Sequence, residues 1–267
     1  MHRGKGGRNA VYAEERRAYI LAALEKRGTV HSYELAEQMG VSRETIRRDI
    51  MELSNRGLLV KTHGGAISTG NGEVLLETPY KLRESRNADE KKRLCAFAAT
   101  LVRESDTIFI DNSTSCSYIL RYLPRTMRLT ILTNSIPLLS EAMKYNSGNW
   151  SVYSTGGQLK GQTMSFNGYV VTQMLGQFSP TKAFMSCHGI NDQLIVQDHY
   201  MEDVEIKRLV LRRSKRACLL LDHSKVNNTG VLDIAHISAF AHVIADGALS
   251  AGVKRDIQNE KVYIDTV

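Results

Sequence analysis

The segment 32–53 constrains the fold of this chain more than any other, and it reads SYELAEQMGVSRETIRRDIMEL. Ser32 and Ser42 open its two halves, and serine is favoured at a helix N-cap, where its hydroxyl accepts a backbone N–H. Gly40 separates the halves, where a tight turn needs a residue without a side chain. Three apolar residues of the second half recur at helical spacing: Ile46, Ile50 and Leu53. The segment therefore predicts two short helices joined by a tight turn.

The second predicted helix carries arginines on the side away from its apolar residues: Arg43, Arg47 and Arg48. A helix that is held by its apolar face, braced by another helix and lined with arginines is suited to the major groove of DNA. The alternative is an ion-paired, solvated helix surface, in which Glu44 and Asp49 neutralise the arginines. We favour DNA contact, because the capping residues, the apolar face and the segment that follows all agree with it.

The residues after this helix predict a small hairpin. A turn signal, SNRG over 54–57, precedes LLVKTHGGA over 58–66, which is rich in β-branched and apolar residues. A hairpin beside a helix pair is the wing of a winged helix. In such a wing Lys61, Thr62 and His63 are placed to reach phosphates or the minor groove, and the two glycines after them let the backbone approach closely.

Together with a helix expected over 14–26, these elements predict a winged helix-turn-helix domain over 13–68, after a basic extension over 1–12. The predicted DNA-binding residues are Ser32, Ser42, Arg43, Glu44, Thr45, Arg47, Arg48, Lys61, Thr62 and His63. Residues 1–70 contain 12 Lys and Arg against 8 Asp and Glu, a net charge of +4, whereas the other 197 residues contain 23 against 20, a net charge of +3. The higher density of positive charge in the first part suits a module that contacts phosphates.

Composition excludes several other classes of protein. Apolar residues make up 42% of the chain and charged residues 24%, as in ordinary globular proteins, and no apolar run reaches the length of a membrane span. The first twelve residues lack the apolar stretch of a secretory signal, so we expect a cytoplasmic protein. We expect free thiols, and neither a metal nor a cofactor, because the four cysteines match no metal-ligand spacing: Cys95, Cys116, Cys187 and Cys218.

The segment STGNG at 68–72 marks a break, from which we expect a linker over 69–87 and a second domain over 88–267. A helix over 88–104 is expected to pack on this domain or on a partner subunit. Short apolar runs typical of buried strands then alternate with helical stretches such as 136–145 and 202–213. The runs are 107–110, 129–132, 151–153, 182–185, 217–221 and 242–245. The alternation predicts an α/β domain with a mainly parallel sheet.

Small polar residues and glycines follow the predicted strands, and in a parallel sheet these strand ends converge on one edge. Hydroxyl-rich loops at helix N-termini present N–H groups to anions, and a lysine at the same edge neutralises phosphate charge. Each loop alone has another explanation in helix caps and turns, and for 133–135 we favour capping. Together the loops predict a site for a phosphate-bearing ligand, with Asp111 or Asp222 accepting from sugar hydroxyls. The predicted effector-binding residues are Asp111, Ser113, Thr114, Ser115, Asn134, Gly156, Gly157, His188, Gly189 and Lys225.

Two motifs resemble the DeoR family of bacterial transcriptional regulators: SRETIRRDIMEL over 42–53 and GLLVKTHGGA over 57–66. The resemblance extends to the strand-end loops of the larger domain, which in this family is similar in fold to ribose-5-phosphate isomerase. It implies a repressor, or less often an activator, of a catabolic operon under the control of a sugar phosphate. Two loops depart from the family pattern. Ser113 stands where glycine is usual, and Ser186 and His188 stand where glycine and aspartate are common, which alters the charge that faces a ligand.

Three hypotheses about function follow. In the favoured one, a homo-oligomer (dimer or tetramer) places two helices in successive major grooves of double-stranded operator DNA, and a small-molecule effector changes its affinity. In the second, the α/β domain is a sugar-phosphate isomerase-like enzyme fused to a DNA-binding module. That enzyme needs a carboxylate base, whereas Asp111, Asp222 and Asp246 are equally well explained as caps or hydroxyl acceptors. In the third, the larger domain only oligomerises, a role that needs no polar rim of strand ends.

Overall fold

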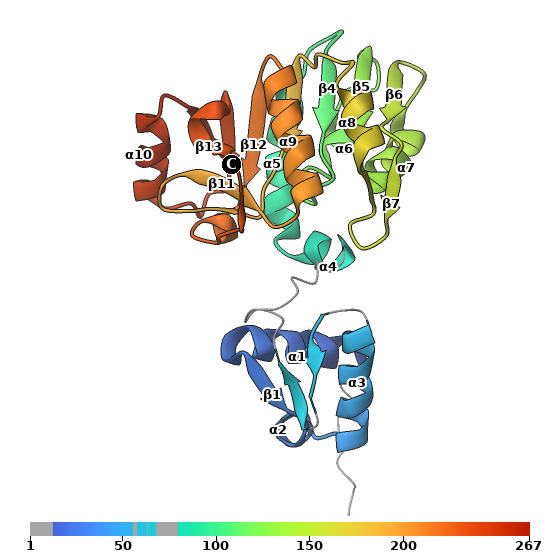
Figure 1. Cartoon of the computed structure of the whole chain (residues 1–267), viewed down its shortest axis with the longest axis vertical. Helices are drawn as coiled ribbons and strands as arrows, with labels where there is room; N and C mark the ends of the chain where they lie inside the picture. Colours follow the sequence, from blue (N-terminus) through green and yellow to red (C-terminus); the bar gives the residue numbers. More distant parts are fainter. Residues whose placement is uncertain (1–12, 56–57, 63, 68–79) are drawn as a thin grey trace, which may run out of the picture. The chain divides into compact units, whose positions relative to one another are not determined.

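The computed structural model describes residues 13–55, 58–62, 64–67 and 80–267. The chain divides into two compact units, Met1–Pro79 and Tyr80–Val267 (Figure 1). Each unit has a buried apolar core of its own. Among the helices described, none is long and apolar enough to cross a membrane.

In its described residues, the first unit has three helices and a small sheet. The helices are α1 (Ala13–Arg27), α2 (Ser32–Met39) and α3 (Arg43–Asn55). The strands are β1 (Thr29–His31), β2 (Val60–Lys61) and β3 (Gly65–Ile67), antiparallel in the order β1-β3-β2. Gly40 turns the chain between α2 and α3 with a φ of 63°. The predicted helix pair and hairpin are confirmed, and β1 adds a third strand to the wing.

Apolar residues from all three helices and from the sheet form the core of this unit: Ile20, Leu24, Val30, Leu35, Ile46, Ile50, Leu53, Leu59 and Ala66. Burial of each large aliphatic side chain contributes roughly 1.5–3 kcal/mol. The three residues predicted for the inner face of α3 all belong to this core. Helix α3 is therefore fixed by that face, and its opposite face is left to solvent.

The second unit is built around a seven-stranded parallel sheet in the order β15-β14-β12-β9-β4-β5-β6. These strands are β4 (Thr107–Ile110), β5 (Leu129–Thr133), β6 (Trp150–Ser154), β9 (Lys182–Met185), β12 (Ala217–Leu221), β14 (His242–Ala245) and β15 (Tyr263–Thr266). The helices are α4 (Tyr80–Ser85), α5 (Ala88–Thr100), α6 (Ile119–Tyr122), α7 (Ile136–Tyr145), α8 (Tyr169–Leu175), α9 (Met201–Arg213) and α10 (Ala251–Asn259). Two small antiparallel sheets complete the unit. One contains β7 (Gln158–Lys160) and β8 (Ser165–Asn167), and the other contains β10 (Gly189–Ile190), β11 (Ile195–Asp198) and β13 (Leu232–His236). The unit also has two 3₁₀ helices, η1 (His223–Lys225) and η2 (Ile237–Ala239).

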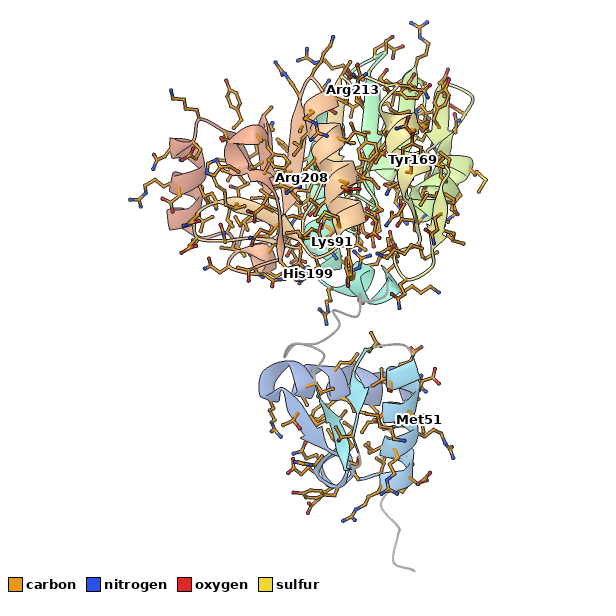
Figure 2. All side chains as sticks on the ribbon, viewed as in Figure 1. Met51, Lys91, Tyr169, His199, Arg208 and Arg213 are labelled. Atoms are coloured by element: carbon orange, nitrogen blue, oxygen red, sulfur yellow. The ribbon has the colours of Figure 1, made fainter. Side chains whose placement is uncertain are left out.

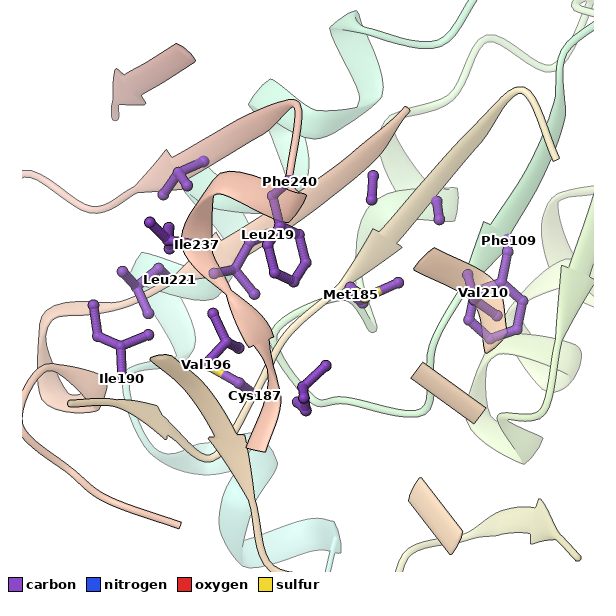
Figure 3. Close-up of a cluster of buried hydrophobic side chains, with 14 of the residues drawn as sticks. Phe109, Met185, Cys187, Ile190, Val196, Val210, Leu219, Leu221, Ile237 and Phe240 are labelled. Carbon is purple, nitrogen blue, oxygen red and sulfur yellow. The ribbon is translucent and has the colours of Figure 1, made fainter. Parts of the chain in front are cut away.

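Helices cover both faces of the large sheet. On β4, Phe109 belongs to one core, whereas Ile108 and Ile110 belong to the other, as the two-residue alternation of a strand requires. Helices α8, α9 and α10 contribute to the first core, and α5, α6 and α7 contribute to the second. Figure 3 shows the first core, in which Met185 of β9 and Val210 of α9 join Phe109. Strands that are apolar on both faces are typical of parallel sheets between helix layers, so the predicted α/β fold is confirmed.

Two segments at the start of the second unit differ from expectation. Helix α5 ends at Thr100 rather than at 104, because the chain turns at Ser105, with a φ of 64°, to enter β4. The expected linker, 69–87, contains α4, which belongs to the second unit. Tyr80 of this helix is only 3% exposed, and its N–H donates to the carbonyl of Gln162 at 2.8 Å. Contacts with the second unit therefore order these residues, although their charged composition is typical of a linker.

The close approach of Gly65 to the first strand provides a test of the wing. A methyl group on Gly65 would lie 1.9 Å from the carbonyl oxygen of Val30, so Gly65→Ala must push β3 away from β1. We expect the unfolding free energy of the first unit to fall by about 1–3 kcal/mol in urea denaturation. Gly64→Ala is the matched control, since a methyl group there meets no described atom within 4 Å. Equal losses in the two variants would contradict the close approach.

Candidate functional site

A side-chain cap fixes the start of α3. The hydroxyl of Ser42 accepts the N–H of Thr45 at 3.1 Å and lies 2.8 Å from the hydroxyl of Thr45, so the predicted N-cap is confirmed. The prediction that Ser32 caps α2 is wrong. The N-cap is His31, which makes no side-chain capping bond, and Ser32 is the first helical residue. Its N–H donates to the carbonyl of Gly64 at 2.8 Å, so Ser32 ties α2 to the wing.

The outward face of α3 presents four of the predicted DNA-binding residues, all exposed: Arg43, Glu44, Arg47 and Arg48. Within the described part of the chain, neither Arg47 nor Arg48 makes an ion pair. Asp49, their partner in the alternative interpretation, is 2% exposed and accepts from Arg16 Nε at 2.8 Å and Arg17 Nε at 3.2 Å. Asp49 therefore holds α3 against α1, and the arginines on the outer face remain available to a polyanion.

A hollow of about 300 Å³ between α3 and the wing is lined by Ser32, Arg47, Ile50, Lys61, Thr62 and Gly65. It brings together four predicted residues from separate segments, of which Arg47, Lys61 and Thr62 are exposed. His63 lies outside the described residues. Met51, labelled in Figure 2, is 44% exposed on α3, and its sulfur lies 3.8 Å from Lys61 Nζ. No sequence pattern indicates this residue, because a single apolar side chain on a charged helix face matches none.

The strand order reverses beside β4. This strand pairs with β5 on one side and with β9 on the other, although β5 follows it directly in the chain and β9 follows much later. Ligands of open parallel sheets bind outside the carboxyl ends of the strands at such a reversal, because the two loops diverge there. The loops concerned are 111–115 after β4 and 186–188 after β9. The polar strand ends singled out in the sequence therefore include both loops at the reversal.

Asp111 joins these two loops. Its carboxylate is 1% exposed. Its Oδ1 accepts from Ser113 through the backbone N–H at 3.0 Å and the hydroxyl at 2.5 Å, and its Oδ2 accepts from the N–H of Ser186 at 3.0 Å. The carboxylate is thus occupied by the protein's own donors. Asp111 positions Ser113 and Ser186, which are the two departures from the family pattern that lie beside it.

Lys225 of η1 lies at the centre of the strand-end site. Its Nζ donates to Ser115 Oγ at 2.9 Å, to Ser186 Oγ at 2.5 Å and to the carbonyl of Cys187 at 3.1 Å. Asp222, 1% exposed, lies 3.8 Å from the same ammonium. Burial alone would raise the pKa of Asp222, but the Lys225 ammonium, helped by hydrogen bonds from Ser224 and Asn87, lowers it. The structure thus brings the predicted Ser115 and Lys225 together beside an ionised carboxylate.

Lys91 of α5 is a second lysine at this site, and sequence reasoning missed it. It is 4% exposed, and its Nζ donates to the carbonyl of Arg83. Burial and the nearby Lys225 ammonium lower the pKa of Lys91 to about 8, against a smaller opposing effect of Asp222. The surrounding sequence, ADEKKR, is typical of a solvated helix surface and gives no sign that one of its lysines is buried.

The predicted residue His188 lies at the rim in a neutral form. Its ring centroid is 3.8 Å from that of His199, and its Nε2 lies 3.2 Å from Asn228 Oδ1. Burial, together with His199, lowers the pKa of His188 to about 4. The imidazole is therefore uncharged at neutral pH and supplies hydrogen bonding rather than positive charge.

Five other predicted residues have structural explanations of their own. A methyl group on Gly189 would lie 1.4 Å from the carbonyl oxygen of Asn228, and one on Gly157 would lie 2.7 Å from Val171. Gly156 and Gly157 also have positive φ values, 59° and 108°, at the turn between β6 and β7. Asn134 is 1% exposed and donates to the carbonyl of Phe166 at 3.2 Å. Thr114 is 5% exposed and donates to the carbonyl of Arg83 at 3.4 Å.

A buried charge cluster next to Asp111 was also not predicted from the sequence. Lys207 of α9, 5% exposed, lies 2.5 Å from Asp198 Oδ2 and 3.9 Å from Asp111 Oδ2. These carboxylates outweigh the burial of Lys207 and raise its pKa. Asp203 accepts from the side-chain amides of Asn112 and Asn167 at 3.4 Å each, and burial raises its pKa. These pairings hold the base of the loops in place.

A cavity of about 900 Å³ lies at the opposite edge of the sheet, where several strands begin. Its basic lining residues are Arg103, Lys182, Lys215, Arg216 and Lys261. Helices α5 and α9 end at this edge, and cations near helix C-termini are stabilised by the helix dipole. Lys182 also pairs with Asp106 at 2.5 Å. The helix ends therefore account for this basic lining.

A winged helix with an arginine-lined helix, joined to an α/β unit with a lysine-centred strand-end site, defines a transcriptional regulator that carries a sensor domain. Comparison with protein families identifies both parts. Residues 16–71 match the DeoR-like helix-turn-helix domain, and residues 86–247 match the DeoR C terminal sensor domain. The chain belongs to the DeoR family and is a DNA-binding transcriptional regulator.

Three relatives that are named as transcriptional regulators or repressors match the chain over most of their length. YulB of Bacillus subtilis, named an uncharacterized HTH-type transcriptional regulator, is 32% identical over 253 residues, which cover 95% of this chain and 96% of that protein. A lactose phosphotransferase system repressor of Staphylococcus aureus is 28% identical over 95% of this chain and 98% of that protein. A protein of the same name from Staphylococcus epidermidis is 30% identical over 85% of this chain and 89% of that protein. The expectation that the chain is not an enzyme is confirmed by these relatives, and the isomerase alternative is set aside.

The solved structures that resemble the chain do so at low similarity. A ribose 5-phosphate isomerase A from Methanocaldococcus jannaschii has 15% identity and a TM-score of 0.39, covering 52% of this chain and 55% of that chain. eIF2B delta from Chaetomium thermophilum has 11% identity and a TM-score of 0.39, covering 84% of this chain and 90% of that chain. The family assignment therefore rests on the two domain matches and the curated relatives.

The buried carboxylate of Asp49 provides a test of how α3 is held. Asp49→Ala removes the buried carboxylate that accepts from Arg16 and Arg17. We expect the unfolding free energy of the first unit to fall by roughly 2–3 kcal/mol, less than for a fully buried pair because both arginines are partly exposed. Glu44→Ala, on the exposed face of the same helix, is the control and should cost about 0.5 kcal/mol or less. Urea denaturation that shows the same loss for both variants would refute the role of Asp49.

Proposed function

We propose that this regulator represses a carbohydrate catabolic operon and binds its operator less tightly when a phosphorylated sugar occupies the strand-end site. The observation that carries the proposal is the ammonium of Lys225, which donates to Ser115 and Ser186 where the loops after β4 and β9 diverge. A phosphate group offers charged oxygens to that donor, and such bonds are stronger than those to hydroxyls. The relatives named lactose phosphotransferase system repressors support a role in sugar metabolism.

The DNA-binding part of the proposal is the domain over 13–68. The exposed arginines of α3 contact base edges and phosphates in the major groove, and Lys61 and Thr62 contact the adjacent backbone. The hollow between α3 and the wing supports this assignment, because it places Arg47 beside Lys61. Ser42 and Thr45 act by fixing the start of α3, since their hydroxyls lie within hydrogen-bond distance of each other.

The effector-binding part of the proposal is centred on Lys225. Ser113, Ser115 and His188 lie on the two loops that Asp111 connects, so these residues contact the ligand while Asp111 positions them. The other predicted residues of the set shape the loops around them: Thr114, Asn134, Gly156, Gly157 and Gly189. Lys91 joins the set as a second cation, because its Nζ donates to the carbonyl of Arg83, which also accepts from Thr114 of the loop after β4.

A homo-oligomer, a dimer or tetramer, completes the proposal. Two copies of α3 then meet two half-sites about one helical turn, roughly 34 Å, apart on the operator. An effector that alters the spacing of the two copies needs to change DNA affinity by roughly 1–3 kcal/mol for a useful switch. The setting is the cytoplasm, where operator DNA is found.

The assignment of α3 is tested by Arg47→Ala. Loss of this exposed side chain should weaken operator binding by about 1–3 kcal/mol, measured by fluorescence anisotropy with DNA selected for binding to the chain. Arg27→Ala, an exposed arginine at the end of α1, is the control and should bind as the unmodified chain does. If Arg47→Ala binds the operator as tightly as Arg27→Ala, α3 is not the recognition helix.

The assignment of the strand-end site is tested by Lys225→Met in a thermal-shift screen against phosphorylated sugars. A ligand at a hundred times its dissociation constant should stabilise the unmodified chain by about 2.7 kcal/mol. Lys225→Met should lose most of this gain, because the ammonium is the central donor. Lys215→Met, at the opposite edge of the sheet, should keep it. Full stabilisation of Lys225→Met would place the ligand elsewhere.

A further inference from the structure

Helix α4 is the first element of the second unit, and it is bonded directly to the strand-end site. The carbonyl oxygen of Arg83, in the last turn of α4, accepts from Lys91 Nζ and from Thr114 Oγ1 at 3.4 Å. Figure 2 shows Lys91 on α5 close to this helix. Thr114 belongs to the loop after β4, so two groups of the site converge on one carbonyl of α4. Residues before Tyr80 lead to the DNA-binding unit.

A second connection runs through Asn87, between α4 and α5. Its Nδ2 donates to Asp222 Oδ1 at 3.1 Å and to Ser224 Oγ at 3.2 Å. Asn87 has a φ of 51°, in the left-handed region that asparagine adopts more readily than most other residues with a side chain. Hydrogen bonds to the loop that also carries Lys225 thus fix the segment between α4 and α5.

The charges at this point are unbalanced in a way that favours a dianion. The ammonium groups of Lys91 and Lys225 both lower the pKa of Asp222, and the Lys225 ammonium lowers the pKa of Lys91. A buried ammonium is costly unless it is paired, and Lys91 has a neutral carbonyl as its acceptor. A phosphate monoester carries close to two negative charges at neutral pH. It therefore offers Lys91 a stronger acceptor than the one that α4 provides.

We propose that α4 transmits the effector signal: a phosphate monoester bound beside Lys225 draws the ammonium of Lys91 away from the carbonyl of Arg83, which releases α4 from the strand-end site. The segment that leads to the DNA-binding unit then loses one of its anchors, and the two copies of α3 in an oligomer are held less firmly for their half-sites. A neutral sugar lacks the charge that competes with the carbonyl, so it leaves α4 in place. This inference rests on the proposed function, from which it takes the phosphate-bearing effector.

Hydrogen–deuterium exchange of the amides of α4 in the full chain tests this transmission, with inorganic phosphate as the probe and chloride at equal ionic strength as the reference. In the unmodified chain, phosphate should speed exchange over Tyr80–Ser85 by about fivefold or more. In Lys91→Met, the amides of α4 should already exchange fast without phosphate, and phosphate should cause no further increase. Lys92→Met is the matched control, since Lys92 is 46% exposed and paired with Asp89, and it should respond as the unmodified chain does.

Lys91→Arg serves as a second variant that keeps a charged donor, and it should retain a phosphate response even if Lys91→Met folds poorly. Two results would overturn the inference. In the first, phosphate stabilises the chain in a Lys225-dependent manner, but exchange in α4 stays constant or Lys91→Met responds like the unmodified chain. Transmission through α4 is then wrong, while the proposed effector site stands. If phosphate, at any concentration, neither stabilises the unmodified chain nor alters exchange in α4, the anion site and the transmission fail together.

Discussion

The strand-end site depends on one ammonium group. Lys225 follows β12, and its hydrogen bonds reach Ser115 after β4 and Ser186 after β9. A single cation thus connects three loops that the reversal of strand order would otherwise separate. A charged ligand that exchanges acceptors with this group acts on all three loops at once. Lys91 and Asp222 set the local balance of charge, and through Lys91 the same balance reaches α4.

In the first unit the arginines divide into two groups with different tasks. Arg16 and Arg17 neutralise the buried Asp49 and fix α3 against α1, whereas Arg47 and Arg48 face outward. Because the apolar core and Asp49 hold the inner face of α3, the residues of the outer face are free to contact DNA without loss of folding stability. In the proposed function, stability and recognition therefore use separate sides of the same helix.

Local patterns allowed most elements to be predicted, because helical spacing and apolar runs are properties of neighbouring residues. The six expected strands of the large sheet are present, and Ser42 caps α3 as its position suggests. What failed depends on contacts between distant segments. Ser32 looks like a second cap, but it is the first helical residue of α2, and its N–H donates to the carbonyl of Gly64 of the wing. Lys91 looks like a solvated residue, and only the folded chain buries it beside Lys225.

In the proposed mechanism, effector binding in the second unit and operator binding in the first oppose each other. Thermodynamic linkage requires the coupling to be reciprocal. The most direct measurement is the affinity of the full chain for a phosphorylated sugar, by calorimetry, with and without saturating operator DNA. We predict that operator DNA weakens sugar binding by the same factor, roughly 5- to 150-fold, by which the sugar weakens operator binding. Equal sugar affinities in the presence and absence of operator would contradict the account.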